Sequence, residues 1–204
     1  MLAITTRAFN GTLFEKFKTT LPTNQRFERF HIHNCDGFEG AFDFLYSAIY
    51  GPFDKIIICD LDCFVWDWVT VYKLALEDID YIVSECDIPH RLSLPDHVGN
   101  PFFWIMDTYR ARIALRDVKK EQIRHLWQPS DPDNEPFWGL YDHLYRVKNL
   151  PYQTIPVRTL PDGISTESDF FVHTRYSREY GHDPFHTTRI NDLFQWAQNQ
   201  KWLS

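Results

Sequence analysis

Two aspartates, Asp60 and Asp62, follow directly after an apolar run in the segment DKIIICDLDCFVWD, residues 54–67. On a strand, residues i and i+2 project to the same side, so we expect these carboxylates to converge where the strand ends. Two carboxylates held close together repel each other, by about 1 kcal/mol or more even in solvent. A divalent cation offsets that repulsion, and such ions often bridge to substrate phosphates. The spacing alone is more typical of an alternative, in which one aspartate caps a turn and the other is solvated. The Ile run before the pair and the bulky apolar residues after it favour a cation site instead.

Strand and helix patterns alternate around these aspartates. The first half of the chain predicts strands at 2–6, at 29–34 and in the stretch 54–67, separated by helices that begin near 12 and 38. This order describes parallel βαβ units. In open α/β sheets, ligands bind outside the carboxyl ends of the strands, which is where the two aspartates are expected.

The second half predicts further elements of the same domain. The expected helices cover 67–77, 107–125 with a basic face, a segment stacked on Phe137 to Leu144, and the C-terminal segment. The expected strands are DYIVSE (80–85), PFFWIM (101–106), YQTIPV (152–157) and DFFVH (169–173). Long loops are expected at 86–100 and 128–138, and loops of that length are often functional. No repeat or linker divides the chain, so residues 1–204 are predicted to form one domain.

Composition excludes several classes of protein. The chain has 204 residues, 17% of them aromatic, which indicates a packed core, and its net charge of −7 argues against nucleic-acid binding by bulk charge. No apolar run approaches the roughly 20 residues that a membrane span needs. The N-terminal segment is too short and too quickly polar for a secretory signal. The four cysteines form no C-x-x-C pair, so we expect buried thiols and a reducing cytoplasm.

The segment DLD after its apolar strand resembles the D-x-D motif of GT-A-fold glycosyltransferases. ITTRAFN resembles that family's first-strand segment at the donor nucleotide, and HNCDG resembles the stretch whose aspartate approaches the base or ribose. NPFFWIM resembles the later strand on the acceptor side, and DFFVH resembles the late strand that supplies a histidine to the metal. The resemblance implies a GT-A-like, Rossmann-like α/β fold: a mixed, mostly parallel sheet flanked by helices. It implies a nucleotide-binding half (1–66) and an acceptor half that includes the C-terminal metal-ligand strand (67–204).

The resemblance also implies a cofactor, a donor and site residues. Mn²⁺ or Mg²⁺ would bind Asp60, Asp62 and His173 and bridge the diphosphate of a nucleotide sugar, most often a UDP-sugar. The ion would act as a Lewis acid toward the departing diphosphate, which makes Asp62 a catalytic residue as well. The donor nucleotide would contact seven residues: Thr5, Thr6, Arg7, Asp36, Asp60, Arg175 and Arg178.

An inverting enzyme of this kind also needs a general base for the acceptor hydroxyl. The acidic loop DPDNEPFW offers Asp131, Asp133 and Glu135, and we favour Glu135, then Asp133. Their ordinary role at a helix start is capping, and that interpretation stays open. A retaining enzyme needs no such base, so the stereochemistry stays open too. The acceptor could be a glycan, a protein, a small molecule or modified DNA.

Two other functions remain alternatives. DLDCF also resembles the first motif of haloacid-dehalogenase-like phosphatases, with Asp60 as nucleophile and Asp62 as acid. That motif normally lies on the first strand, whereas two βα units precede it here. The other alternative is a binding protein that keeps the fold without catalysis. A metal pair at His31 and His33, or at His182 and His186, is a weaker hypothesis, because Pro184 interrupts the second pair.

Overall fold

The apolar run before the two aspartates forms an interior strand, β3 (Lys55–Cys59), of a six-stranded sheet. The computed structural model describes residues 1–22, 29–33, 37–84, 99–127 and 138–201. The strand order is β2-β1-β3-β6-β5-β7. The other strands are β1 (Leu2–Arg7), β2 (Arg29–His33), β5 (Asp80–Ser84), β6 (Gly99–Asp107) and β7 (Tyr152–Pro156).

The sheet is mixed, with parallel pairing on both flanks of one reversed strand. β1 runs parallel to β2 and β3, and β5 runs parallel to β7. β6 is antiparallel to both β3 and β5, and Cys59 pairs with Phe103 across the first of these ladders. The predicted mixed, mostly parallel α/β sheet is therefore confirmed.

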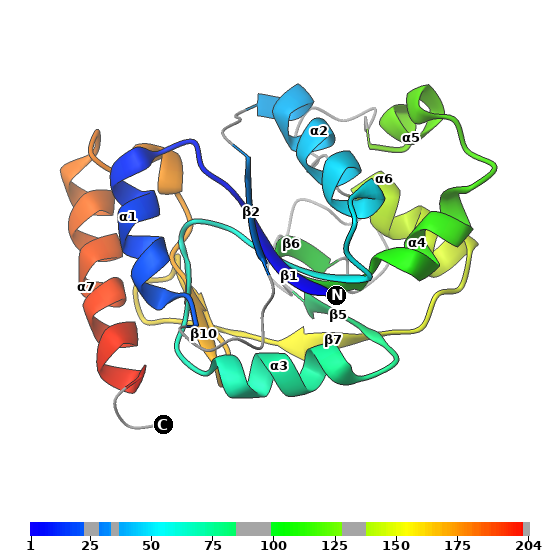
Figure 1. The fold of residues 1–204 in the computed structure, drawn as a ribbon. Coiled ribbons are helices and arrows are strands. Elements are labelled where there is room, and N and C mark those ends of the chain that lie inside the picture. The colour runs from blue at the N-terminus through cyan, green and yellow to red at the C-terminus, as the bar shows by residue number, and fades with distance from the viewer. Residues whose placement is uncertain (23–28, 34–36, 85–98, 128–137, 202–204) are drawn as a thin grey trace.

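Helices cover both faces of this sheet because β3 alternates its side chains between two cores. Ile57 and Cys59 face one core, which they share with a first group of three helices. Ile56 and Ile58 face the second core, on the opposite side of the sheet, which they share with a second group of helices. Figure 1 shows the two groups on different sides of the sheet. The first group is α1 (Gly11–Thr20), α3 (Trp68–Leu76) and α7 (Pro184–Lys201). The second is α2 (Gly37–Tyr50), α4 (Thr108–Leu115), α5 (Lys120–Trp127), α6 (Trp138–Tyr141) and the π-helical turn η1 (Asp142–Val147).

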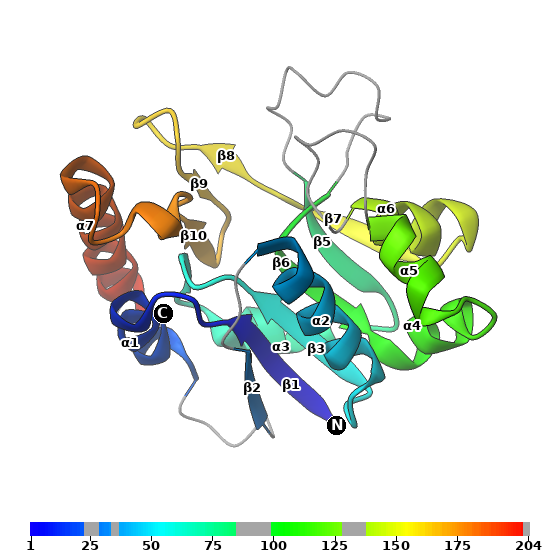
Figure 2. The same ribbon diagram turned by 90° about the horizontal axis from the view of Figure 1, so that it is seen from above.

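A small antiparallel sheet lies between α7 and the main sheet, as Figures 1 and 2 show. Its order is β4-β10-β9-β8. The strands are β4 (Cys63–Val65), β8 (Arg158–Thr159), β9 (Thr166–Glu167) and β10 (Phe171–His173). The sequence predicts only β10 among them, since strands of two or three residues are too short to show a period. Through the pairing of β10 with β4, this sheet brings a late segment of the chain next to the aspartates.

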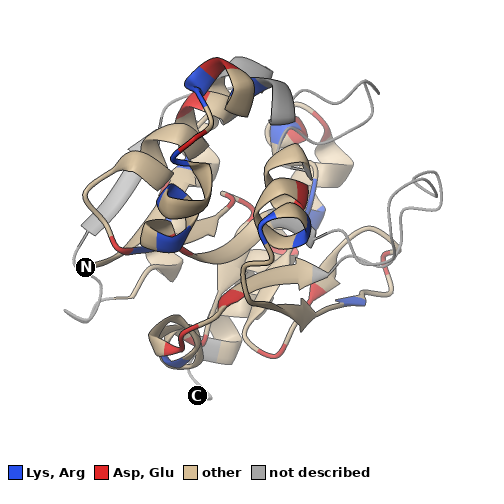
Figure 3. Ribbon diagram, turned by 90° about the vertical axis from the view of Figure 1, so that its right-hand side faces the viewer, with Lys and Arg blue, Asp and Glu red and all other residues tan. Residues whose placement is uncertain are grey.

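The predicted basic helix at 107–125 is wrong as one element, because the structure has two helices, α4 and α5, with Arg116 at the C-cap of α4. Two of its arginines make internal contacts. Arg110 pairs with Asp78, at 2.8 Å, and with buried Asp80, at 3.2 Å. Arg112 donates to the carbonyl oxygens of three residues before β3: Ile49, Gly51 and Phe53. Figure 3 shows basic and acidic residues interspersed on the helices of this face.

Among the residues that the structure describes, no helix has the length and apolar character that crossing a bilayer requires.

Candidate functional site

Asp60 and Asp62 lie in a tight turn between β3 and β4, so the expectation that they share one face of a strand is wrong. β3 ends at Cys59, and the amide of Cys63 donates to the carbonyl oxygen of Asp60 at 3.0 Å. The turn gives the two carboxylates different environments. The side chain of Asp60 is 25% exposed, whereas that of Asp62 is 2% exposed.

The small sheet brings His173 to Asp62. β10 pairs with β4 so that His173 lies opposite Cys63, and the amide of Thr174 donates to the carbonyl oxygen of Asp62 at 2.9 Å. The imidazole Nε2 of His173 lies 3.6 Å from Oδ1 of Asp62. Both side chains are buried, so two groups far apart in the sequence meet out of contact with solvent.

The carboxylate of Asp62 is held in its ionised form by its neighbours. Burial by itself raises the pKa of this carboxyl, but the nearby His173 and hydrogen bonds to the carboxylate outweigh burial, so the pKa lies below its ordinary value. One of those hydrogen bonds comes from the hydroxyl of Ser177. Oδ1 of Asp62 is buried and accepts no hydrogen bond from the described residues. Sequence reasoning missed Ser177, because a serine between Tyr176 and Arg178 is typical of an ordinary turn.

Arg7 and Asp60 face each other across the carboxyl ends of β1 and β3. A guanidinium nitrogen of Arg7 lies 3.9 Å from Oδ1 of Asp60. β2 lies on one side of β1 in the sheet, and β3, the next strand in the chain, lies on the other side of β1. The strand order therefore reverses at β1. Ligands of open α/β sheets bind at such points. Thr5 and Thr6, predicted at the same place, are buried within β1.

The other two predicted arginines follow β10, and Arg178 lies close to the segment that follows β1. Arg175 comes two residues after His173, and Arg178 lies in the short 3₁₀ turn η2 (Ser177–Glu179). The guanidinium carbon of Arg178 is 5.7 Å from the ring centroid of Phe9. Next to it, the side-chain amide of Asn10 donates to the carbonyl oxygen of Tyr180 at 3.0 Å. η2 is thus joined to the segment that follows Arg7.

The donor set fits a divalent metal as a partial site. Two ligands of one ion, each at about 2.0–2.2 Å from it, stand roughly 3–4 Å apart, and the 3.6 Å between Asp62 and His173 lies in that range. The buried oxygen of Asp62 that accepts no hydrogen bond is open to such a bond. Among the described residues, no three His, Cys, Asp or Glu side chains gather as a metal cluster. Two protein ligands suit Mg²⁺, which usually keeps waters and takes substrate phosphates as ligands.

Some predicted residues lie outside the part of the chain that the structure describes. They are the donor contact Asp36 and the acidic candidates Asp131, Asp133 and Glu135. Most of both predicted long loops lies there as well, although β6 begins at Gly99 inside the first of them. Of the four cysteines, Cys59 and Cys63 are described, and both are buried free thiols. α7 begins at Pro184, so His182 precedes the helix and does not form a helical pair with His186.

No protein-family model matches the chain, and no curated protein matches it in sequence. Solved structures to which the chain is similar include glycosyltransferases. GlyE of Streptococcus pneumoniae TIGR4 matches 94% of this chain and 51% of its own, with a TM-score of 0.49 and 13% identity. Its apo form matches 74% and 44%, with a TM-score of 0.47 and 9% identity. A glycosyltransferase involved in the glycosylation of the major capsid of PBCV-1 matches 75% and 81%, with a TM-score of 0.45 and 12% identity. The chain spans about half the length of GlyE.

Proposed function

We propose that the protein is a metal-dependent glycosyltransferase that moves a sugar from a nucleotide-diphosphate sugar, most simply a UDP-sugar, to an acceptor hydroxyl. The observation that supports it most is the meeting of Asp62 and His173, 3.6 Å apart and buried, beyond the carboxyl end of β3. A carboxylate that only capped a turn would not need a histidine brought to it by a separate strand. In this proposal the whole chain is one catalytic domain, with its nucleotide side in residues 1–66 and its acceptor side in 67–204.

Asp62 and His173 would hold Mn²⁺ or Mg²⁺, with Asp60 as a further ligand directly or through water. When bound, the ion supplies Lewis-acid stabilisation of the charge that grows on the departing diphosphate. Asp60 has a second partner, Arg7, at 3.9 Å, so the same carboxylate can orient that guanidinium toward the donor. The buried carboxylate–imidazole pair is pre-assembled, which lowers the reorganisation needed when a ligand arrives.

Positive charge around this centre supports binding of a diphosphate. Arg7 ends β1, and Arg175 and Arg178 follow His173 closely. Guanidinium groups bind phosphate oxygens in a bidentate manner, which suits a polyanionic donor on a protein of net charge −7. Thr5, Thr6 and Asp36 remain predicted contacts of the nucleotide.

Glu135 and Asp133 stay candidates for the general base of an inverting reaction, and a retaining reaction would leave them with structural roles. The acceptor class is open among glycans, proteins, small molecules and modified DNA.

Calorimetric titration with UDP, in the presence and absence of Mn²⁺, tests the proposal directly. We expect metal-dependent UDP binding by the native protein and none by Asp62→Asn, whose fold should be retained because the side chain keeps its size. Incubation with a panel of nucleotide sugars should then reveal slow hydrolysis of the true donor. Hydrolysis of a generic phosphate ester without UDP binding would instead support the phosphatase alternative. UDP binding without hydrolysis or transfer of any donor would support a non-catalytic binding protein.

A further inference from the structure

The chain turns sharply just after β10, through two successive residues with left-handed backbone. Arg175 has φ of 55° and Tyr176 has φ of 60° with ψ of 34°. This conformation is unfavourable for residues with a Cβ, by roughly 1–2 kcal/mol each. Glycine occupies other positive-φ positions of the same region, Gly163 and Gly181. Because strained backbone persists only where its surroundings determine it, some other group must hold this corner.

Arg189, from α7, is the group that holds the corner. Its guanidinium donates to the carbonyl oxygens of Thr174 and of Arg175, the second at 3.0 Å, so it grips both sides of the Thr174–Arg175 junction. The same group donates to the hydroxyl of Ser165. Arg189 is only 8% exposed, and its charge is compensated by Asp162, whose carboxylate oxygen lies 3.6 Å away.

The corner that Arg189 grips surrounds Asp62. Before it, His173 contacts the carboxylate and the amide of Thr174 donates to the backbone of Asp62. After it, Ser177 begins the turn η2, and its hydroxyl contributes to the lowered pKa of the Asp62 carboxyl. The positions of His173 and Ser177 relative to Asp62 thus depend on the path of the chain between them. That path is the segment fixed by Arg189.

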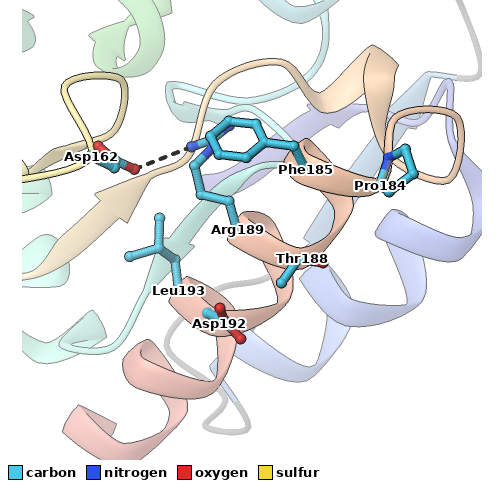
Figure 4. Close-up of a pocket in the computed structure, with 7 residues that line it drawn as sticks. All are labelled: Asp162, Pro184, Phe185, Thr188, Arg189, Asp192 and Leu193. Atoms are coloured by element: carbon cyan, nitrogen blue, oxygen red, sulfur yellow. Dashed lines mark ion pairs between the residues drawn. The ribbon is translucent and has the colours of Figure 1, made fainter.

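Asp162, the ion-pair partner of Arg189, lines a groove at the surface. Figure 4 shows Arg189 reaching from α7 toward Asp162, with Phe185 and Leu193 also lining this groove of about 560 Å³. The carboxylate of Asp162 is fixed in turn by the backbone amides of Ile164 and Ser165. The two walls of the groove, α7 and the loop between β8 and β9, are therefore joined by this ion pair and by the hydrogen bond from Arg189 to Ser165.

From these contacts we propose that Arg189 is a positioning residue of the candidate metal site: its guanidinium fixes the Thr174–Tyr176 corner and thereby holds His173 and Ser177 around Asp62. The inference rests on the proposed function, because it gives that corner a role in metal binding. Groups that orient metal ligands from outside typically change metal affinity by about 10–100-fold when replaced.

Arg189→Lys is the decisive variant, because lysine keeps the charge beside Asp162 but cannot reach all the carbonyl acceptors at once. We expect its Kd for Mn²⁺, measured by calorimetry, to rise about 10-fold or more. Arg112→Lys is the matched control, since Arg112 also donates to three carbonyl oxygens but lies away from the site. It should lower Tm and leave the Mn²⁺ affinity unchanged. A folded Arg189→Lys protein that binds Mn²⁺ as tightly as the native protein overturns the inference.

A second readout needs no metal. The imidazole signals of His173 in NMR spectra of the metal-free protein should shift in Arg189→Lys and stay in place in Arg112→Lys. If the native protein fails to bind Mn²⁺, the proposed function fails, while these signals still decide whether Arg189 positions His173. Asp162→Asn is the second variant if Arg189→Lys does not fold, because it removes the ion pair with Arg189 and leaves Arg189 itself in place. It should shift the same signals in the same direction, and unchanged signals would count against the inference.

Discussion

The imidazole of His173 lies nearly parallel to the ring of Phe102, with the ring centroids 3.7 Å apart and the planes at 15°. Phe102 belongs to β6, and its carbonyl oxygen accepts the amide of Asp60 at 2.8 Å. Phe102 thus contacts both parts of the candidate site. Its carbonyl oxygen holds the turn that carries the aspartates, and its ring packs against the imidazole of His173. The candidate site is supported by the antiparallel strand next to β3, not only by the loops around it.

Phe102→Leu should therefore affect both stability and metal binding. The loss of a buried ring should lower the free energy of unfolding by about 1–3 kcal/mol. The imidazole of His173, freed from its stacking partner, should bind Mn²⁺ more weakly together with Asp62. Urea unfolding measures the first effect and calorimetry the second. Phe44→Leu, in the other core, is the control: it should show a similar loss of stability with unchanged Mn²⁺ affinity. Equal Mn²⁺ affinities for both variants would refute the role given to Phe102.

The different exposure of the two aspartates predicts different consequences of their removal. Asp62 is paired with His173 in the buried part of the site, whereas Asp60 is a quarter exposed and faces Arg7. Asp62→Asn should abolish Mn²⁺ binding with or without UDP. Asp60→Asn should keep weak Mn²⁺ binding and lose most of the gain that UDP brings, since it also removes the ion pair with Arg7. Titrations of Mn²⁺ into each variant, with and without UDP, compare these losses. Identical losses in the two variants would mean that the aspartates act as one symmetric pair.

The sequence predicts those elements whose pattern lies within one short segment, and it does not predict features set by contacts between distant segments. The apolar run Ile56–Cys59 and the helical stripe of α2 are local patterns, and both elements lie where those patterns place them. The sequence did not show that Asp60 and Asp62 lie in a tight turn, because that turn is set by a hydrogen bond from Cys63 and by pairing of β4 with β10. That partner strand lies more than a hundred residues further along the chain.

The residues that sequence reasoning missed have roles that exist only in three dimensions. Arg189 lies in a polar stretch of α7, where an arginine reads as a solvated side chain, yet it is buried against the β10 corner. Phe102 reads as one of several apolar residues in a strand. His173 was found from the sequence only because its segment resembles the late strand of a known fold. No periodicity or spacing connects it to Asp62.

The buried thiol of Cys63 predicts a pH dependence of stability. Burial, followed by the neighbouring thiol of Cys59 and the carboxylates of Asp62 and Asp60, raises the pKa of Cys63 well above its usual 9.0. Above that pH the unfolded chain releases this proton while the folded protein keeps it. The folded state then binds more protons, so this contribution to stability is present at neutral pH and is lost as pH rises above about 9.

Cys63→Ala removes the titrating group and should remove that contribution. The difference in unfolding free energy between the native protein and Cys63→Ala should shrink between pH 8 and pH 10, by at most about 1.4 kcal/mol per pH unit. Urea unfolding of both proteins across this range measures it, and other titrating groups cancel in the difference. A difference that stays constant with pH would show that the thiol titrates alike in the folded and unfolded chain.

The left-handed corner after β10 predicts a substitution that stabilises the protein. Tyr176 has φ of 60° and is 55% exposed, so replacing it removes little buried surface. Glycine adopts this conformation without the Cβ clash, and the entropy it adds to the unfolded chain offsets only part of that relief. Tyr176→Gly should therefore raise the free energy of unfolding by up to about 1 kcal/mol, despite the loss of a ring contact with His186.

The same substitution in a helix provides the control. Tyr109 is 61% exposed on α4, where glycine is unfavourable, so Tyr109→Gly should lower stability by roughly 0.5–1 kcal/mol. Thermal unfolding of the two variants beside the native protein tests the contrast. A higher Tm for Tyr176→Gly would mean that the native residue is kept at an energetic cost, which points to a use for its exposed ring beside Ser177. A fall in Tm equal to that of the control would show that the corner is not strained and that Tyr176 contributes to the fold through its contact with His186.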